Sequence, residues 1–147
     1  MESYERAYLY KRIVAAKLYM DDHFCEKLDL NKIAGAANFS KFHFFRLFKE
    51  IYGQTPLSYL TSKRIDESKK LLSGGLAIIE VAQRVGFESS TSYAAVFKRH
   101  TRITPSQFKL AKTREALQKS ERPLVFVPNC FAESRGWVEN SNIQEHV

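Results

Sequence analysis

Apolar side chains recur along most of the chain at spacings of three and four residues, which is the period of an amphipathic helix. In the first such segment, Leu9, Ile13, Ala16 and Met20 fall on one face. No strand pattern is found before residue 120. The sequence therefore predicts an all-α fold of about seven helices. The predicted helices cover residues 8–20, 30–37, 41–52, 56–73, 78–85, 90–101 and 105–117.

Residues that favour helix ends support these boundaries. Asp29 and Ser40 precede two of the helices and are expected to act as N-caps. Asn38 tolerates a left-handed backbone and marks a tight turn between the same two helices. Gly53 is expected to end the helix that Ser40 begins, and Pro56 fits the first turn of the longest helix.

The chain contains an internal repeat. Residues 33–59 align with residues 81–108 at an offset of 48 up to Phe39 and Phe87, and of 49 after one extra residue in the second turn. Each copy consists of a short helix, a tight turn and a second helix, which is the helix-turn-helix plan. A bundle duplicated only for packing is the alternative. The identical pairs are Ala34/Ala82, Phe39/Phe87, Ser40/Ser89, Phe48/Phe97, Lys49/Lys98, Thr55/Thr104 and Pro56/Pro105.

The second helix of the first copy has two contrasting faces. Its predicted buried stripe is Phe44, Leu47, Phe48 and Ile51. On the opposite face, Phe42 and Phe45 are expected to contact thymine methyl groups, unless they pack on a neighbouring helix. Arg46 is expected to bind a guanine edge or a phosphate, while Lys41 and Lys49 hold phosphates. The candidate DNA contacts of this helix are Ser40, Lys41, Phe42, Phe45, Arg46 and Lys49.

The second helix of the second copy presents smaller groups. Its predicted buried stripe is Tyr93, Val96, Phe97 and His100. The candidate DNA contacts on its other face are Ser89, Ser90, Thr91, Ala94, Ala95 and Lys98. Because these side chains offer few strong base contacts, the first copy is expected to supply more sequence discrimination. The second copy is expected to depend on phosphate contacts and DNA shape.

The charge of the chain favours a polyanionic partner. It has 23 Lys/Arg and 16 Asp/Glu among 147 residues, a net charge of +7. Residues 1–115 carry 20 of the cations and 12 of the acids, so the excess belongs to the repeated part. Neutralising phosphates releases condensed counterions, which makes double-stranded DNA a suitable partner.

Other classes of protein find little support. No apolar stretch approaches the length that spans a bilayer, and the N-terminus is not a secretory signal, so the cytoplasm is expected. No enzyme activity, metal or cofactor is expected, because His23, His43, His100 and His146 are scattered and no nucleophile elbow or phosphate loop occurs. Two alternatives stay open. One is a reactive thiol at Cys25 or Cys130, as in DNA-repair methyl acceptors, and the other is a protein-interaction module that has lost DNA binding.

The helix between the copies fits binding by a single chain. Residues 56–73 would form a helix about 27 Å long. Such a helix could separate the two second helices by about one DNA turn, near 34 Å, so a monomer is expected to suffice, with some DNA bending. The predicted organisation is a first lobe at 1–54, a linker helix at 55–73, a second lobe at 74–117 and a C-terminal extension at 118–147. In the extension, Leu124 to Val127 are expected to pack back on the helices, or else to contact a partner.

These motifs resemble the DNA-binding domain of the AraC/XylS family of transcription regulators. The resemblance covers about residues 8–115 and is most specific from Val85-Gly86-Phe87 to Pro105. It rests on Ile33-Ala34, Ser40, Arg46-Leu47-Phe48-Lys49, Gly53, Tyr59, Arg64-Ile65, Leu71-Leu72, Val81-Ala82, Val85-Gly86-Phe87, Ser92-Tyr93, Phe97-Lys98 and Thr104-Pro105-Ser106.

The resemblance implies promoter binding by two helix-turn-helix lobes, often with activation through RNA polymerase. Family DNA contacts correspond to Phe42, Phe45, Arg46, Ser90, Thr91, Ala94 and Ala95. Phe45 replaces a usual polar residue, and Ala95 replaces a longer polar or basic one, which bears on sequence preference and not on fold. The chain resembles the small stand-alone members of the MarA/SoxS type; a fragment of a larger regulator is the alternative.

Overall fold

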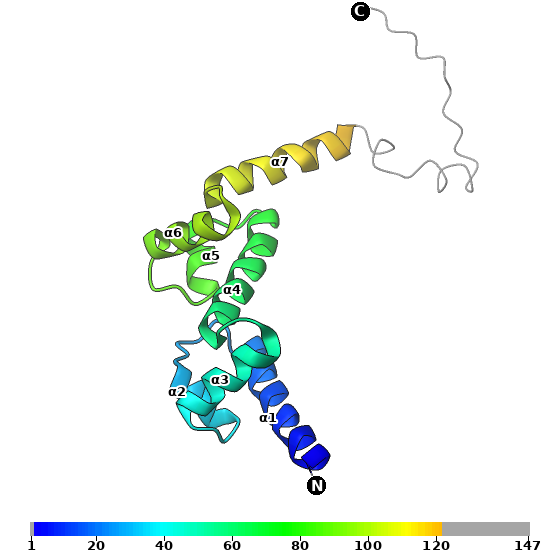
Figure 1. The fold of residues 1–147 in the computed structure, drawn as a ribbon. Coiled ribbons are helices and arrows are strands. Elements are labelled where there is room, and N and C mark those ends of the chain that lie inside the picture. Colours follow the sequence, from blue (N-terminus) through cyan, green and yellow to red (C-terminus); the bar gives the residue numbers. More distant parts are fainter. Residues whose placement is uncertain (1, 122–147) are drawn as a thin grey trace, which may run out of the picture. The chain divides into compact units, whose positions relative to one another are not determined.

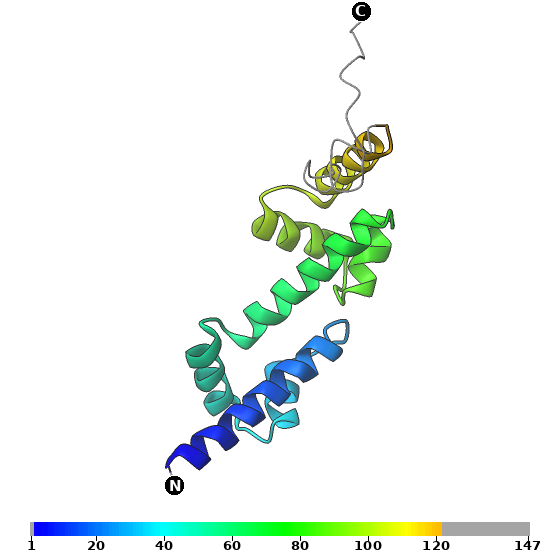
Figure 2. The same cartoon turned by 90° about the vertical axis from the view of Figure 1, so that its right-hand side faces the viewer.

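The computed structural model describes residues 2–121 of the chain, and it confirms the all-α prediction: these residues form seven α-helices and no strand. The helices are shown in Figure 1 and, turned by 90°, in Figure 2. Their bounds are α1 (Glu2–Asp22), α2 (Leu30–Ala36), α3 (Lys41–Tyr52), α4 (Pro56–Ser73), α5 (Ile78–Arg84), α6 (Ser90–Thr101) and α7 (Pro105–Glu121).

The predicted helix ends are confirmed in the middle of the chain. The Asp29 carboxylate accepts a hydrogen bond from the Lys32 backbone amide at 2.8 Å, which caps α2. Asn38 turns with φ 55° and Gly86 with φ 86°, the left-handed conformation that each turn requires. Gly53 ends α3 with φ 68°.

The outermost helices are longer than predicted. The helix expected over residues 8–20 begins at Glu2, and the helix expected to end near residue 117 continues to Glu121. Residues 4–7 and 118–121 in these added turns are all exposed, so hydrophobic periodicity did not reveal them. They contain no Gly or Pro, and a helix propagates readily through such residues once it has formed.

The first three helices enclose one hydrophobic core. Ile13, Ala16 and Met20 of α1 are fully buried and pack with Phe44 and Phe48 of α3. The stripe predicted for α1 is therefore confirmed. We call helices α1–α3 the first triplet.

Helices α4–α6 enclose a second core and form the second triplet. Ile65 and Leu72 of α4 are buried against Val81 of α5 and against Tyr93 and Phe97 of α6. Phe108 at the start of α7 packs on Phe97, with 5.6 Å between the ring centroids. Two separate cores in one chain match the repeat seen in the sequence.

Helix α4 belongs to both cores, because Leu60 lies in the first and Ile65 and Leu72 lie in the second. It contacts α1 and α3 as well as α5 and α6. In both views α4 runs from the first triplet to helices α5 and α6 (Figures 1 and 2).

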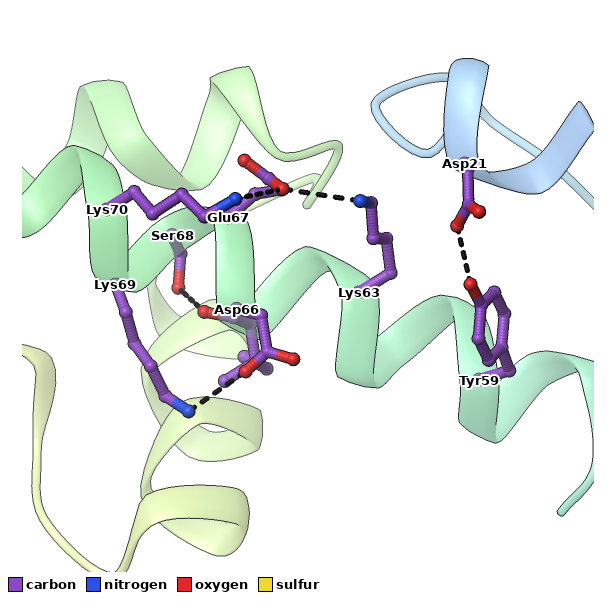
Figure 3. A network of polar contacts seen from close by, with 9 residues as sticks. Asp21, Tyr59, Lys63, Asp66, Glu67, Ser68, Lys69 and Lys70 are labelled. Carbon is purple, nitrogen blue, oxygen red and sulfur yellow. Dashed lines mark hydrogen bonds and ion pairs between the residues drawn. The ribbon is translucent and has the colours of Figure 1, made fainter. Parts of the chain in front are cut away.

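A polar network also connects α4 to α1. The Tyr59 hydroxyl donates to the Asp21 carboxylate at 2.6 Å (Figure 3). The Lys17 ammonium donates to the same carboxylate at 2.9 Å. Burial alone would raise the pKa of Asp21, but these two hydrogen bonds outweigh it and lower the pKa. Further along α4, Glu67 pairs with Lys63 and with Lys70.

The candidate site described below lies in one compact unit, Met1–Lys109. The rest of α7 belongs to a second unit, in which Glu115 pairs with Lys112 and Lys119 along the helix surface. The predicted packing of Leu124 to Val127, and Cys130, lie outside the described residues.

Candidate nucleic-acid interface

The orientation of α3 is set by its cap and by two buried aromatic rings. The Ser40 hydroxyl accepts a hydrogen bond from the His43 backbone amide at 3.4 Å, which begins the helix. Phe44 and Phe48 are fully buried, and Leu47 is half-buried on the same side. The opposite side of α3 therefore points away from the core.

The outward face of α3 combines aromatic and basic side chains. Phe42 is 83% exposed, so it does not pack on a neighbouring helix, and Phe45 is 37% exposed. Lys41, Arg46 and Lys49 are exposed too, and within the described part of the chain none of them forms an ion pair. A cationic face that also carries an exposed Phe suits a surface that is anionic and carries methyl groups.

Helix α6 is held in the same way. The Ser89 hydroxyl accepts a hydrogen bond from the Ser92 backbone amide at 3.1 Å, and Arg102, with φ 71°, ends the helix. Tyr93 and Phe97 are fully buried. The prediction that His100 continues this buried stripe is wrong, because His100 is exposed. The apolar contacts of α6 end with Phe97, on which Phe108 packs.

The outward face of α6 is flatter than that of α3. Thr91, Ala95 and Lys98 are exposed, while Ser90 and Ala94 are half-buried. None of these residues has a large apolar side chain or a guanidinium group. This face can approach another surface closely, but only Lys98 offers a charge.

At the offset of 49, each position on the outward face of α3 corresponds to a position on the outward face of α6. Phe42 corresponds to Thr91, and Arg46 corresponds to Ala95. The structure therefore gathers the candidate residues onto two equivalent helix faces, each on the second helix of a helix-turn-helix motif.

Arg12 was not predicted from the sequence, but it contacts the turn between the two helices of the first motif. Its Nε donates to the Ala37 carbonyl at 2.9 Å, and a second guanidinium nitrogen donates to the Asn38 carbonyl. Its guanidinium also stacks over the Phe39 ring, 3.9 Å from the centroid. Arg12 thus satisfies the carbonyls at the end of α2 and fixes the turn that leads into α3. The signal that could have revealed it is a second arginine at a repeat-related position, Arg64.

Other kinds of site are not evident in the described residues. Among residues 2–121, no three His, Cys, Asp or Glu side chains gather to hold a metal ion. Cys25 is exposed and unpaired with any cysteine of this range. None of the helices at 2–121 has both the length and the apolar character required to cross a membrane.

The fold and the two outward faces define the class: a protein with two helix-turn-helix motifs in tandem. A family model described as a helix-turn-helix domain matches residues 33–111, more than half of the chain and both motifs.

Relatives agree with this class. The transcriptional activator AarP of Providencia stuartii is 31% identical over 97 residues, which is 65% of this chain and 72% of AarP. The MmsAB operon regulatory protein of Pseudomonas aeruginosa is 32% identical over 92 residues, or 62% of this chain. The matched part is only 30% of that regulator's length.

A solved structure adds a DNA complex to the comparison. The DNA-binding domain of the global transcriptional factor AdpA, crystallised with a target DNA, superposes with a TM-score of 0.65 at 26% identity. The match covers 76% of this chain and 96% of that domain. The chain belongs to the AraC family of helix-turn-helix transcription regulators.

Proposed function

We propose that this chain binds double-stranded promoter DNA in a sequence-specific manner and activates transcription. The observation that carries the proposal is the outward face of α3, the second helix of a helix-turn-helix motif. There Phe42 is 83% exposed, and the nearby cations Lys41, Arg46 and Lys49 form no ion pair within residues 2–121. The AdpA domain, which has the same fold, was crystallised with its target DNA. The chain acts through binding, not catalysis.

Helix α3 enters the major groove and supplies most of the discrimination. Phe42 and Phe45 contact thymine methyl groups, and Arg46 donates to a guanine edge. Lys41 and Lys49 hold phosphates at the two ends of the helix, which sets its register. The exposed Ser40 hydroxyl, which caps α3, contacts the same DNA backbone.

Helix α6 enters a neighbouring segment of the major groove. Lys98 and the hydroxyls of Ser89, Ser90 and Thr91 contact phosphates. Ala94 and Ala95 allow close approach of the helix, and sequence preference there comes from DNA shape.

One chain binds as a monomer, because two second helices on one scaffold supply both halves of a site. Activation requires a surface for RNA polymerase, and the name of AarP supports this role over repression. A chromosomal target implies that the protein acts in the cytoplasm.

The test is in-solution selection from randomised duplexes, followed by the salt dependence of binding to the enriched sequence. A two-part, non-palindromic site with its parts about one turn apart is the expected result. Steep salt dependence without an enriched sequence would instead describe a general basic DNA binder.

A second candidate is a protein-interaction module, which the small side chains on the outward face of α6 favour. The same selection separates the two functions. A folded protein with no measurable affinity for any duplex would support the interaction module.

A further inference from the structure

The repeat continues into the first helix of each triplet, at an offset of 52. Arg12 and Arg64 occupy equivalent places on α1 and α4. The core positions that follow them correspond as well, and all are at most 1% exposed. These pairs are Ile13/Ile65, Ala16/Ser68 and Met20/Leu72. Helix α4 therefore occupies the same structural position in the second triplet as α1 does in the first.

The connectors between the first two helices of the triplets differ in length. The offset falls from 52 on the first helices to 48 on the second, so the first triplet has four additional residues there. Residues 23–29 connect α1 to α2, whereas only residues 74–77 connect α4 to α5. We call residues 23–29 the long connector.

The two equivalent arginines use their donors differently. Arg12 bonds to the end of α2 in its own triplet. Arg64 lies over the Phe87 ring of its own triplet, 5.8 Å from the centroid. Its hydrogen-bond acceptors lie outside that triplet. The Nε atom donates to the Phe24 carbonyl at 2.6 Å, and Nη2 donates to the Glu26 carbonyl at 2.7 Å. Both carbonyls belong to the long connector, so Arg64 joins the two triplets with two short, charge-assisted hydrogen bonds.

The long connector also packs against the turn of the second motif. A Cβ atom on Gly86 would lie 2.7 Å from the Cys25 carbonyl oxygen, closer than real Cβ atoms approach. Only glycine fits at this contact, and the φ of 86° at Gly86 is a second, independent reason for glycine there. Phe24 packs partly against both cores. The Lys27–Glu88 ion pair spans the same boundary, but both side chains are exposed, so it adds little.

We propose that the long connector, Arg64 and Gly86 form a junction that fixes the separation and rotation of α3 and α6, and so sets the spacing of the two DNA elements the protein accepts. The inference rests on the proposed function, since it concerns how two elements are bound at once. With a rigid junction, α3 and α6 can bind their DNA elements at the same time only when the spacing of the elements matches the geometry of the junction. One additional base pair moves an element by about 3.4 Å and turns it by roughly a tenth of a helical turn.

The experiment compares Arg64→Lys with Arg12→Lys, its repeat-related control. Dissociation constants are measured by fluorescence anisotropy for the selected duplex and for duplexes with one base pair inserted or deleted between the elements. The wild-type protein is expected to lose at least about tenfold in affinity with either change. Arg64→Lys should reduce this loss to about threefold or less, because the triplets then adjust to the DNA. Arg12→Lys should weaken all duplexes equally and leave the ratio unchanged.

A second pair of variants separates the contact from backbone strain. Gly75 has φ 90°, close to that of Gly86, but a Cβ atom there meets nothing within 4 Å. Gly86→Ala should relax the spacing preference, and Gly75→Ala should not, although both lose the conformational freedom of glycine.

The outcomes distinguish the junction from the function. If the wild-type protein enriches a sequence but Arg64→Lys and Gly86→Ala keep its spacing ratio, the junction is overturned and DNA recognition stands. A wild-type protein that enriches no sequence overturns the proposed function, and the role of the junction with it.

Discussion

The two triplets have the same frame and different outward faces. Phe48 and Phe97 occupy equivalent, fully buried positions, and Ser40 and Ser89 cap the equivalent helices. The face of α3 carries aromatic and guanidinium groups, whereas that of α6 is nearly flat. The buried aromatic positions and the caps repeat, whereas most of the exposed positions on the two outward faces differ. The pair Lys49/Lys98 is an exception, because it repeats although both side chains are exposed on the outward faces.

The cores differ in where they place a tyrosine hydroxyl. Tyr59, which packs on the first core, corresponds to Phe108, and Tyr93 in the second core corresponds to Phe44. The Tyr59 hydroxyl has the Asp21 carboxylate as its partner, 2.6 Å away. The Tyr93 hydroxyl is buried and makes no hydrogen bond among residues 2–121. One hydroxyl is thus satisfied and the other is not, so their removal should have opposite effects on stability.

The largest expected effect is on DNA affinity, from Arg46→Ala. This variant gives α3 the alanine that α6 has at the equivalent position, Ala95. If Arg46 contacts a base, specific binding should weaken by about 1–3 kcal/mol while binding to random DNA changes little. Titration of labelled duplexes measures both affinities. The stability of the variant should stay within about 0.5 kcal/mol of the wild type, because Arg46 is exposed.

Ala95→Ser, at the equivalent position of α6, is the matched control and should change specific binding far less. An equal loss on specific and random DNA would place Arg46 on a phosphate instead. Lys49→Ala is the reference for that case, since loss of a phosphate contact lowers the salt slope by about one.

The next effect is on stability. The variant Tyr59→Phe places at the first core the same side chain that Phe108 supplies at the second. The variant loses a hydrogen bond to a carboxylate, so unfolding should become easier by about 1–2 kcal/mol at neutral pH. The pKa of Asp21 is lowered in the folded state, so its contribution is present above its unfolded pKa of about 3.9 and is lost as the pH falls through the folded value.

Denaturant titrations at several pH values test this pair. The difference between wild type and Tyr59→Phe should be constant well above the unfolded pKa of Asp21 and should shrink as the pH falls below it, through the lower folded pKa. Asp21→Asn should remove most of the pH dependence and most of the effect of Tyr59→Phe. A difference of the same size at every pH would mean that packing, not the hydrogen bond to Asp21, is lost.

Most of the fold could be predicted from the sequence because its signals are local. Caps such as Asp29 and Ser40, left-handed turns such as Asn38 and Gly86, and apolar spacing each depend on a few neighbouring residues. The same logic placed the outward face of α3 correctly.

The errors come from non-local effects. His100 has the spacing of a buried residue, but spacing alone does not say where the apolar contacts of a helix end. The junction was missed because its acceptors are backbone carbonyls of Phe24 and Glu26, which no side-chain pattern reveals. Only the change in repeat offset marks the additional residues that supply them.

A smaller effect is expected from Phe42→Ala, which removes the most exposed aromatic group of the α3 face. Preference at one A·T position should relax by about 1 kcal/mol, because the methyl contact is lost while phosphate contacts remain. Affinities for duplexes with thymine, cytosine or uracil at that position measure it, and uracil isolates the methyl group. Thr91→Ala, at the equivalent position of α6, is the control. Unchanged discrimination between thymine and uracil would remove Phe42 from base recognition.

The smallest expected effect has the opposite sign. Tyr93→Phe gives the second core the ring found at Phe44. Burial raises the pKa of Tyr93 and the nearby Ser68 hydroxyl lowers it, while Ser68 donates its own proton to the Ile65 carbonyl at 2.7 Å. Because the buried hydroxyl has no hydrogen-bond partner within the described chain, its removal should stabilise the protein by about 0.5–1 kcal/mol.

Thermal and denaturant unfolding of Tyr93→Phe beside Tyr59→Phe measures the contrast directly. The same chemical change should raise stability when it is made in the second core and lower it when it is made at the first core, although both rings keep their places. A loss of stability in Tyr93→Phe would show that its hydroxyl does find a partner in solution, with Ser68 the group to test by Ser68→Ala. The two cores would then differ in where their polar contacts lie, and not in whether those contacts are satisfied.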